Sequence, residues 1–349
     1  MAGQTRRVRI GNTAIGGGNP VLIQSMTNTD TADVQATLSQ IERLCFAGCE
    51  AVRCAFYSKE CAPAFKEIKK HMRVPLIADV HFDASLAVLA MENGADKVRV
   101  NPGNLRGESA LETVVACAKA CSAALRIGVN AGSLEPRLLK EYGAPTPQAL
   151  AQSAAEAVRI VYDMGFYDVA VSIKASSVPV TVQACRLFSA QNEAPMHIGI
   201  TEAGTYENAV VKSAVGLGAL LLDGIGDTVR VSITGDPVQE VDAARRILQS
   251  AGARKFYPEV ISCPTCARTQ IDVTELAHRV QQILSEKQKP ITAAVMGCVV
   301  NGPGEAKHAD IGIAGGGNKA ALFAKGTLIG TYSEKSILEV FSRYIDRHF

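Results

Sequence analysis

The chain has 349 residues, of which 47% are hydrophobic, only 5% are aromatic and none is tryptophan. This length allows two domains, and an aliphatic interior is typical of α/β enzymes with buried parallel strands. Lysine and arginine outnumber aspartate and glutamate by only 36 to 34, which excludes an overall field that would attract nucleic acid or an anionic membrane. The first residues lack the apolar core of a signal peptide, so we expect a cytoplasmic protein without membrane spans.

Short runs rich in valine, isoleucine and leucine alternate with helical patterns up to about residue 250, which predicts βα units on a parallel sheet. Eight strands are expected, at Val21–Met26, Ala51–Phe56, Leu76–Phe82, Lys97–Pro102, Leu125–Gly132, Val169–Ser176, Met196–Gly204 and Thr228–Gly235. Helices are expected between them, for example at Ala32–Ala47, Ser85–Asn93, Pro147–Met164 and Pro237–Ser250. Eight strands close a TIM barrel, and no Gly-x-Gly-x-x-Gly follows the first strand to favour an open doubly wound sheet.

The pattern changes after Gly252. A helix is expected at Asp272–Leu284, strands at Ile291–Met296 and Ile311–Ala314, and a final helix at Ser336–Arg347. The sequence therefore predicts an α/β protein with an N-terminal (βα)8 TIM barrel over residues 1–254 and a small α+β domain over residues 255–349. The glycine runs at 16–18 and 315–317 predict tight turns, because neither has the sequence context of a phosphate loop.

Polar side chains recur at alternate positions near the carboxyl ends of the expected strands, where barrel active sites lie. They are Arg53, Asp79 with His81, Arg99 with Asn101, Arg126 with Asn130, Lys174 between Ser172 and Ser176, and Arg230 with Ser232. Asp79 and Glu202 are the visible counter-charges, which leaves an excess of positive charge suited to a diphosphate. Salt bridges to neighbouring loops are the alternative for any single arginine. His81 is placed for proton transfer beside Asp79, whereas His197 is expected to be a packing residue.

Three of the ten cysteines, in Cys263-Pro-Thr-Cys266 and at Cys298, have a spacing that suits zinc or an iron–sulfur cluster. The candidate fourth ligands are Glu305, His308 and Asp310. His308 would complete a zinc site, whereas Glu305 would give a cluster with one labile oxygen ligand. Spacing alone leaves both possibilities open. The other seven cysteines fall mostly in helices or at apolar positions and are expected to pack as small hydrophobic residues.

The stretches Ser262-Cys-Pro-Thr-Cys-Ala-Arg268 and Met296-Gly-Cys-Val-Val-Asn-Gly-Pro-Gly-Glu305-Ala closely resemble the signature of the 4-hydroxy-3-methylbut-2-enyl diphosphate synthase family (IspG/GcpE), in its two-domain bacterial form. The resemblance covers the whole chain, through Pro20-Val-Leu-Ile-Gln-Ser-Met-Thr-Asn-Thr, Ala78-Asp-Val-His-Phe, Val98-Arg-Val-Asn-Pro-Gly-Asn and Gly199-Ile-Thr-Glu-Ala-Gly. It implies an oxidoreductase of the non-mevalonate isoprenoid pathway. The implied reaction opens the ring of 2-C-methyl-D-erythritol 2,4-cyclodiphosphate and removes a hydroxyl, giving (E)-4-hydroxy-3-methylbut-2-enyl diphosphate.

The same resemblance implies a 4Fe-4S cluster held by Cys263, Cys266, Cys298 and Glu305. It implies that the diphosphate is held by Arg53, Arg99, Arg126, Lys174 and Ser232, and that Asn101, Asn130, Glu202 and Asn301 line the rest of the pocket. The expected catalytic residues are Glu305, Glu202, Asp79 and His81, with Glu305 giving way to substrate and helping to deliver a proton.

The resemblance further implies flavodoxin or ferredoxin as electron donor and a homodimer in which the cluster domain of one chain caps the barrel of its partner. Two other classes of function remain. One is a zinc-stabilised barrel that acts on a phosphorylated or pterin substrate without redox chemistry. The other is a zinc module that binds nucleic acid, which the near-neutral charge disfavours.

Overall fold

The computed structural model describes residues 4–81, 83–101, 109–298, 300, 304, 308–317 and 319–349. The chain divides into two compact units, Met1–Arg254 and Lys255–Phe349. Each unit has its own buried apolar clusters. Among the described helices, none combines the length and the hydropathy that crossing a lipid bilayer would need.

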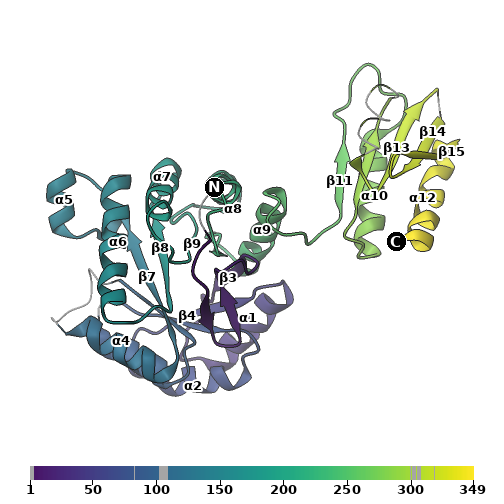
Figure 1. Ribbon diagram of the computed structural model, residues 1–349. Helices are drawn as coiled ribbons and strands as arrows, with labels where there is room; N and C mark the ends of the chain where they lie inside the picture. Colours follow the sequence, from purple (N-terminus) through teal and green to yellow (C-terminus); the bar gives the residue numbers. More distant parts are fainter. Residues whose placement is uncertain are drawn as a thin grey trace. The chain divides into compact units, whose positions relative to one another are not determined.

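The first unit is a parallel barrel with helices on its outside (Figure 1). Its strands are β3 (Leu22–Met26), β4 (Ala51–Ala55), β5 (Leu76–Asp79), β6 (Lys97–Val100), β7 (Ala124–Asn130), β8 (Val169–Lys174), β9 (His197–Ile198) and β10 (Thr228–Val229). They are hydrogen-bonded in the order β8-β7-β6-β5-β4-β3-β10-β9. A parallel bridge between Val171 and Met196 brings β9 against β8 and completes the ring. The predicted TIM barrel is confirmed.

Helices alternate with these strands, and local sequence sets where they begin. They are α1 (Val34–Phe46), α2 (Cys61–His71), α3 (Ala84–Glu92), α4 (Ala110–Cys121), α5 (Pro136–Tyr142), α6 (Pro147–Asp163), α7 (Val178–Ser189), α8 (Tyr206–Leu222) and α9 (Pro237–Ser250), with a 3-10 turn η2 (Ala131–Ser133) before α5. At the start of α6 and α9 a proline in the first turn follows a capping side chain, Thr146 or Asp236, that accepts a backbone N–H. The fixed φ of proline and the cap together define these starts.

A short antiparallel hairpin closes the N-terminal end of the barrel. It consists of β1 (Val8–Ile10) and β2 (Thr13–Ile15). Its apolar side chains are completely buried in one cluster with the first inward-facing residues of the barrel strands; the cluster contains Val8, Ile10, Ile15, Leu22, Ala51, Ile77, Ala124 and Ala170. The sequence did not predict this hairpin, because three-residue strands are too short to show a period of two. The barrel therefore has an apolar floor.

The last two barrel strands are much shorter than predicted. β9 and β10 have two residues each, where the sequence predicted Met196–Gly204 and Thr228–Gly235. Glu202 and Ser232 therefore lie in loops that follow the strand ends. Glu202 has a φ of +53°, in the left-handed region that few residues other than glycine adopt.

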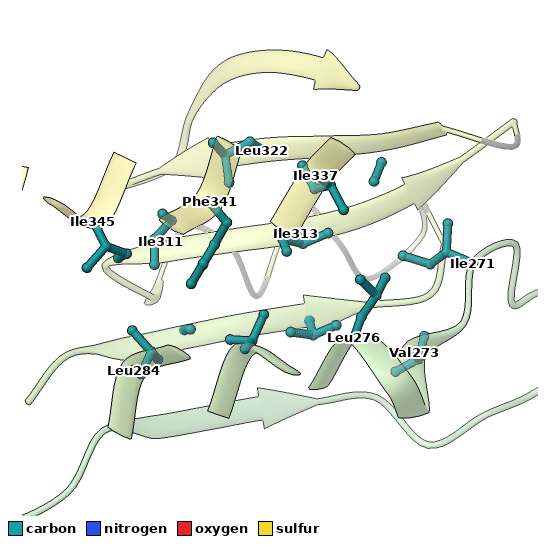
Figure 2. Close-up of a cluster of buried hydrophobic side chains, with 14 residues drawn as sticks. Ile271, Val273, Leu276, Leu284, Ile311, Ile313, Leu322, Ile337, Phe341 and Ile345 are labelled. Atoms are coloured by element: carbon teal, nitrogen blue, oxygen red, sulfur yellow. The ribbon is translucent and has the colours of Figure 1, made fainter. Parts of the chain in front are cut away.

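The second unit is a five-stranded sheet with two helices over one face (Figure 2). Its elements are β11 (Glu259–Ser262), α10 (Val273–Glu286), β12 (Thr292–Met296), β13 (Ile311–Gly316), β14 (Lys319–Ala324), β15 (Thr327–Ser333) and α12 (Glu334–His348). Strands β11 to β13 are parallel, and β13 to β15 are antiparallel. Leu276 of α10 and Phe341 of α12 pack into one core with Ile313 and Leu322 of the sheet. The predicted mixture of sheet and helix is confirmed.

Two details of this unit differ from the prediction. Strands β11, β14 and β15 were not predicted. The tight turn expected at 315–317 is wrong for Gly315 and Gly316, which end strand β13, and the left-handed turn residue is Gly317 with a φ of +57°. A Cβ at Gly315 would lie 2.7 Å from the backbone oxygen of Gly297, so close packing of two backbones accounts for glycine there.

Candidate functional site

Strand register aligns the inward-facing polar residues of neighbouring barrel strands. Asp79 on β5 is in register with Arg99 on β6, and Arg99 with Arg126 on β7. Asn130 near the end of β7 is in register with Lys174 at the end of β8. Because alternate residues of a strand share a face, one carboxylate and several cations are brought together inside the barrel, as the parity of the sequence suggests.

Asp79 lies at the centre of this group. Its Oδ1 is 3.8 Å from Nη1 of Arg53 and 3.8 Å from Nη1 of Arg99, and its Oδ2 is 3.4 Å from Nε2 of His81. Burial alone would raise the pKa of Asp79, but Arg53, the hydrogen bond from His81 and Arg99 outweigh burial and lower the pKa below its usual range. Asp79 is therefore ionised at neutral pH and acts as a counter-ion to two arginines.

Arg126 and Lys174 are cations that Asp79 does not directly balance. Arg126 is 2% exposed, and its Nε and Nη1 have no hydrogen-bond partner among the described residues. Burial, followed by repulsion from Arg53 and Arg99, lowers the pKa of Arg126. Burial and then repulsion from Arg126 and Arg53 likewise lower the pKa of Lys174. These two side chains gain most from an anionic ligand, because it would supply the missing counter-charge.

Arg230 has its own counter-ion, which the sequence analysis missed. Its Nε and Nη2 each donate to Glu240 on α9 at 3.0 Å, and Ser25 also donates to Glu240. Glu202, one of the two counter-charges named from the sequence, is exposed. The sequence does contain a signal for the ion pair of Glu240, because Glu240 lies on the buried face of α9 together with Val241 and Ala244. A glutamate at an apolar helical position indicates a buried ion pair.

Two inward-facing glycines make room for the cations. A Cβ at Gly128 would lie 2.7 Å from Nε of Arg99. A Cβ at Gly199 would lie 2.5 Å from the backbone oxygen of Arg230 and 2.8 Å from Nζ of Lys174. The sequence analysis missed both as site residues, although each stands at an inward position of its strand pattern. An inward glycine in a strand indicates that another group approaches the backbone closely.

The remaining predicted residues of the barrel lie near the carboxyl ends of the strands. Nδ2 of Asn101 donates to Oγ of Ser133 at 3.0 Å, which ties the end of β6 to η2. Asn130 and Ser232 are half-buried, and Glu202 is exposed. The amide and hydroxyl groups among them supply neutral hydrogen bonds around the cations, which suits a ligand with hydroxyl groups beside its phosphates.

The three cysteines named from the sequence line one pocket of the second unit. The pocket holds about 120 Å³ and is lined by Cys263, Cys266 and Cys298 together with Arg268 and Met296, among others. The backbone N–H of Gly297 donates to Sγ of Cys263 at 3.2 Å. Among the described residues no three potential ligands already lie at metal-binding distance. Three thiols around one small pocket nevertheless fit a thiophilic metal centre, since thiolates prefer zinc and iron–sulfur clusters.

Glu305, one candidate for the fourth ligand, lies outside the described residues. The predicted pocket residue Asn301 also lies outside them. Of the other two candidates, His308 is exposed. Asp310 is engaged in the fold, because its Oδ2 accepts from the N–H of Thr292 at 2.8 Å and so fixes the start of β12. This hydrogen bond gives Asp310 a role in holding the fold.

The two units thus offer complementary chemistry. The barrel interior presents arginine and lysine donors in excess of carboxylates, which is the arrangement that binds phosphate oxygens. The second unit presents soft sulfur ligands at a pocket open enough to accept an inorganic group. The arginine, lysine and carboxyl side chains described in the barrel interior cannot supply electrons for a reduction, so a redox reaction there would depend on that group.

Comparison with known families matches both units. A family model described as the GcpE TIM-barrel domain matches residues 5–245. A second one, described as the GcpE protein C-terminal domain, matches residues 259–347.

Full-length relatives match as well. A protein of Caldanaerobacter subterraneus subsp. tengcongensis is 52% identical over 98% of this chain and 97% of its own length. One of Nitratidesulfovibrio vulgaris is 51% identical over 98% of this chain and 89% of its own length. Both relatives are named 4-hydroxy-3-methylbut-2-en-1-yl diphosphate synthase (flavodoxin).

Solved structures with similar folds share little sequence. An N-acetylneuraminic acid synthetase from Leptospira borgpetersenii has a TM-score of 0.52 and 14% identity, covering 73% of this chain and 93% of that one. The Yersinia pestis dihydropteroate synthase has a TM-score of 0.52 and 13% identity, covering 71% of this chain and 99% of that one. At this level of identity the similarity concerns the barrel fold alone.

Proposed function

Since the chain belongs to the GcpE family, we propose that it is a flavodoxin-dependent 4-hydroxy-3-methylbut-2-en-1-yl diphosphate synthase of the non-mevalonate isoprenoid pathway. The enzyme reductively opens 2-C-methyl-D-erythritol 2,4-cyclodiphosphate. Two electrons and one proton enter, C–O bonds break, and the linear diphosphate and one water leave. The observation that carries the proposal for this chain is the group of buried cations around Asp79, in which Arg126 has no partner for two of its donor atoms among the described residues.

The proposed cofactor is a 4Fe-4S cluster with Cys263, Cys266, Cys298 and Glu305 as ligands. The shared pocket of the three cysteines supports this choice. A bound cluster supplies single electrons, which no side chain offers. A carboxylate is a poorer ligand than a thiolate for such iron, so Glu305 is the ligand that we expect to exchange.

Within the barrel, we assign the diphosphate to Arg53, Arg99, Arg126, Lys174 and Ser232. The planar forks of the arginines bind phosphate oxygens in pairs, and the buried setting strengthens each charge-assisted hydrogen bond. Asn101, Asn130, Glu202 and Asn301 are assigned to the hydroxyl-bearing part of the substrate, where the amides can donate and accept hydrogen bonds and the carboxyl group of Glu202 can accept them.

Proton delivery is assigned to carboxylates and one histidine. Glu305 is the proposed donor where the hydroxyl leaves as water. Asp79 stays ionised and orients His81 through the 3.4 Å contact between Oδ2 and Nε2, and Glu202 completes the set from the loop after β9. The left-handed φ of Glu202 supports a functional role, because such backbone strain persists where the fold over-determines it.

The proposed partners are a flavodoxin, with ferredoxin as the alternative donor, and a second copy of the chain. In the homodimer the cluster domain of one chain caps the barrel of the other. We place the enzyme in the cytoplasm, where cysteines remain reduced and available to a metal centre.

The decisive experiment is an anaerobic assay of the purified protein with the cyclic diphosphate and reduced flavodoxin, combined with iron and sulfide analysis. The proposal requires turnover together with about four irons and four sulfides per chain. Stoichiometric zinc without sulfide, and no reductive turnover, would support the alternative of a zinc-stabilised barrel instead.

A further inference from the structure

Several buried polar side chains inside the barrel carry atoms that have no hydrogen-bond partner among the described residues. Gln24, Lys97, Arg126 and His197 are each at most 2% exposed. The atoms without a partner among the described residues include Nζ of Lys97 and Nε2 of His197. Buried polar groups are nearly always hydrogen-bonded, so each exception calls for an explanation. The unpartnered atom of Lys97 would be the costliest of these to bury, because the whole positive charge of a protonated lysine would lie on that nitrogen.

Lys97 lies where the apolar floor meets the cationic interior. On β6 it is in register with Ile77 of β5 and Ala124 of β7, and both belong to the floor cluster. Arg99 follows two residues later on the same strand and faces the same way. Lys97 is 0% exposed, so its amine is separated from water by the floor on one side and by the site residues on the other.

The titratable groups that face the barrel interior around Lys97 are mostly basic. They are Arg53 on β4, Asp79 on β5, Arg99 on β6, Arg126 on β7, Lys174 on β8, His197 on β9 and Arg230 just after β10. Asp79 already balances two arginines, and Glu240 pairs with Arg230.

An ammonium at Lys97 would have neither a hydrogen bond nor a close counter-ion among the described residues. Burying such a charge costs several kcal/mol, and a buried amine usually loses its proton instead. In line with this geometry, burial, followed by repulsion from Arg126 and Arg53, lowers the pKa of Lys97 far below its usual range.

We propose that Lys97 balances charge for the substrate site: its amine is neutral while the barrel is empty and takes up a proton from bulk solvent when a diphosphate binds above it. The inference rests on the proposed function, since it requires an anion among Arg53, Arg99 and Arg126. One N–H bond forms on Lys97 and one bond to hydrogen breaks in the buffer acid, with no transfer of electrons. Ring opening converts a phosphate diester into a terminal phosphate with one more negative charge, so the added positive charge also favours product formation.

The test is calorimetric titration of the oxidised holoenzyme with 2-C-methyl-D-erythritol 2,4-cyclodiphosphate, without reductant, in buffers of different ionisation enthalpy. The diester phosphates of this ligand do not titrate near neutral pH, so any proton exchanged belongs to the protein. We expect uptake of about one proton per ligand and an affinity that falls up to about tenfold per pH unit. Lys97→Met should abolish both effects, and Lys66→Met, on the exposed face of α2, should keep both.

The outcomes separate this inference from the proposed function. Binding without proton uptake in the wild type overturns the role of Lys97. Uptake that persists in Lys97→Met also overturns it, because the proton then goes to another group such as Lys174 or His197. Absence of any binding contradicts the proposed substrate instead. Should Lys97→Met fail to fold, Lys97→Gln, which cannot titrate either, takes its place.

Discussion

Asp79 is the carboxylate on which two buried arginines and a histidine converge. Its side chain is 11% exposed, and the guanidinium groups of Arg53 and Arg99 approach the same oxygen. Removing one partner of a buried charge group leaves the other charges uncompensated, which costs more than the pair itself contributes. The stability of the empty barrel therefore depends on this side chain.

Asp79→Asn should lower the free energy of unfolding by about 3 kcal/mol at pH 7, because Arg53 and Arg99 lose their counter-ion. The folded pKa of Asp79 is depressed, so its contribution is complete above the unfolded pKa of about 4 and disappears as pH falls through the folded pKa. The difference between wild type and variant should therefore shrink in strong acid. Urea unfolding at several pH values measures both effects. Asp242→Asn, in an exposed pair with Arg246, should change stability by less than about 1 kcal/mol.

Gly128→Ala should weaken binding of the cyclic diphosphate by about tenfold or more. The new Cβ would lie only 2.7 Å from Nε of Arg99, so the guanidinium group would have to move. Calorimetric titration of the oxidised protein gives the affinity directly. Gly132→Ala is the matched control, since its Cβ would meet nothing within 4 Å. Equal affinities for the two variants would show that Arg99 does not need this space.

For individual residues, the sequence predicted which side chains face the barrel interior but not which charged groups pair with one another. A period of two along each strand is sufficient to place Arg53, Asp79 and Arg99 on one face. The partner of Arg230 was not predictable from the strands, because Glu240 comes from a helix outside the barrel. The role of Gly128 depends on a side chain of the neighbouring strand, and a single sequence does not give that register directly.

Among the secondary-structure elements, those of the second unit form a core whose buried members are aliphatic and aromatic side chains, with Cys263 packed at its margin. Fourteen buried residues, including Val280, Ile313 and Phe341, form one cluster between the sheet and the helices α10 and α12. The cysteines lie in the loop after β11 and just after β12. A metal centre at this place adds reactivity to an element arrangement that already has a packed interior.

Cys298→Ser should abolish iron and sulfide incorporation while leaving the far-ultraviolet circular dichroism unchanged, because the core between sheet and helices stays intact. Iron and sulfide analysis after anaerobic reconstitution measures the incorporation. Cys121→Ser, an exposed cysteine at the end of α4, should bind iron like the wild type. Loss of helical signal in Cys298→Ser alone would instead indicate a structural metal.

The elements that the sequence predicted are those with long periodic patterns. Helix α9 and strand β7 have enough residues to show their periods and lie where the sequence predicted them. The hairpin of β1 and β2 was too short to recognise. Strand β15 was missed because its residues are mostly exposed, including Leu328 and Ile329, so the sequence shows no inside-outside alternation.

For the molecule as a whole, the groups that the proposed reaction requires are distributed over two units. The anion-binding cations lie in the unit Met1–Arg254, and the thiols lie in the unit Lys255–Phe349. A site that needs both can be assembled within one chain or between two chains. In the proposed homodimer the site is assembled between two chains. Mixtures of two inactive variants should behave differently under the two arrangements.

Arg126→Met removes a barrel cation and Cys298→Ser removes a cluster ligand, so neither variant alone should turn over substrate. Mixing equal amounts after dissociation and reassociation should restore about a quarter of the wild-type activity, because half of the dimers are mixed and each has one complete site. The anaerobic assay with reduced flavodoxin measures the recovery. Assembly of the site within a single chain predicts no recovery at any mixing ratio.

The hairpin of β1 and β2 also has a kinetic consequence. Since Val8, Ile10 and Ile15 seal one end of the barrel, the described part of the interior offers a ligand the same opening for entry and exit. Exchange must then be sequential, with product leaving before the next substrate arrives. The linear diphosphate should therefore inhibit by competition with the cyclic one, and whatever covers that opening should set the rate of turnover.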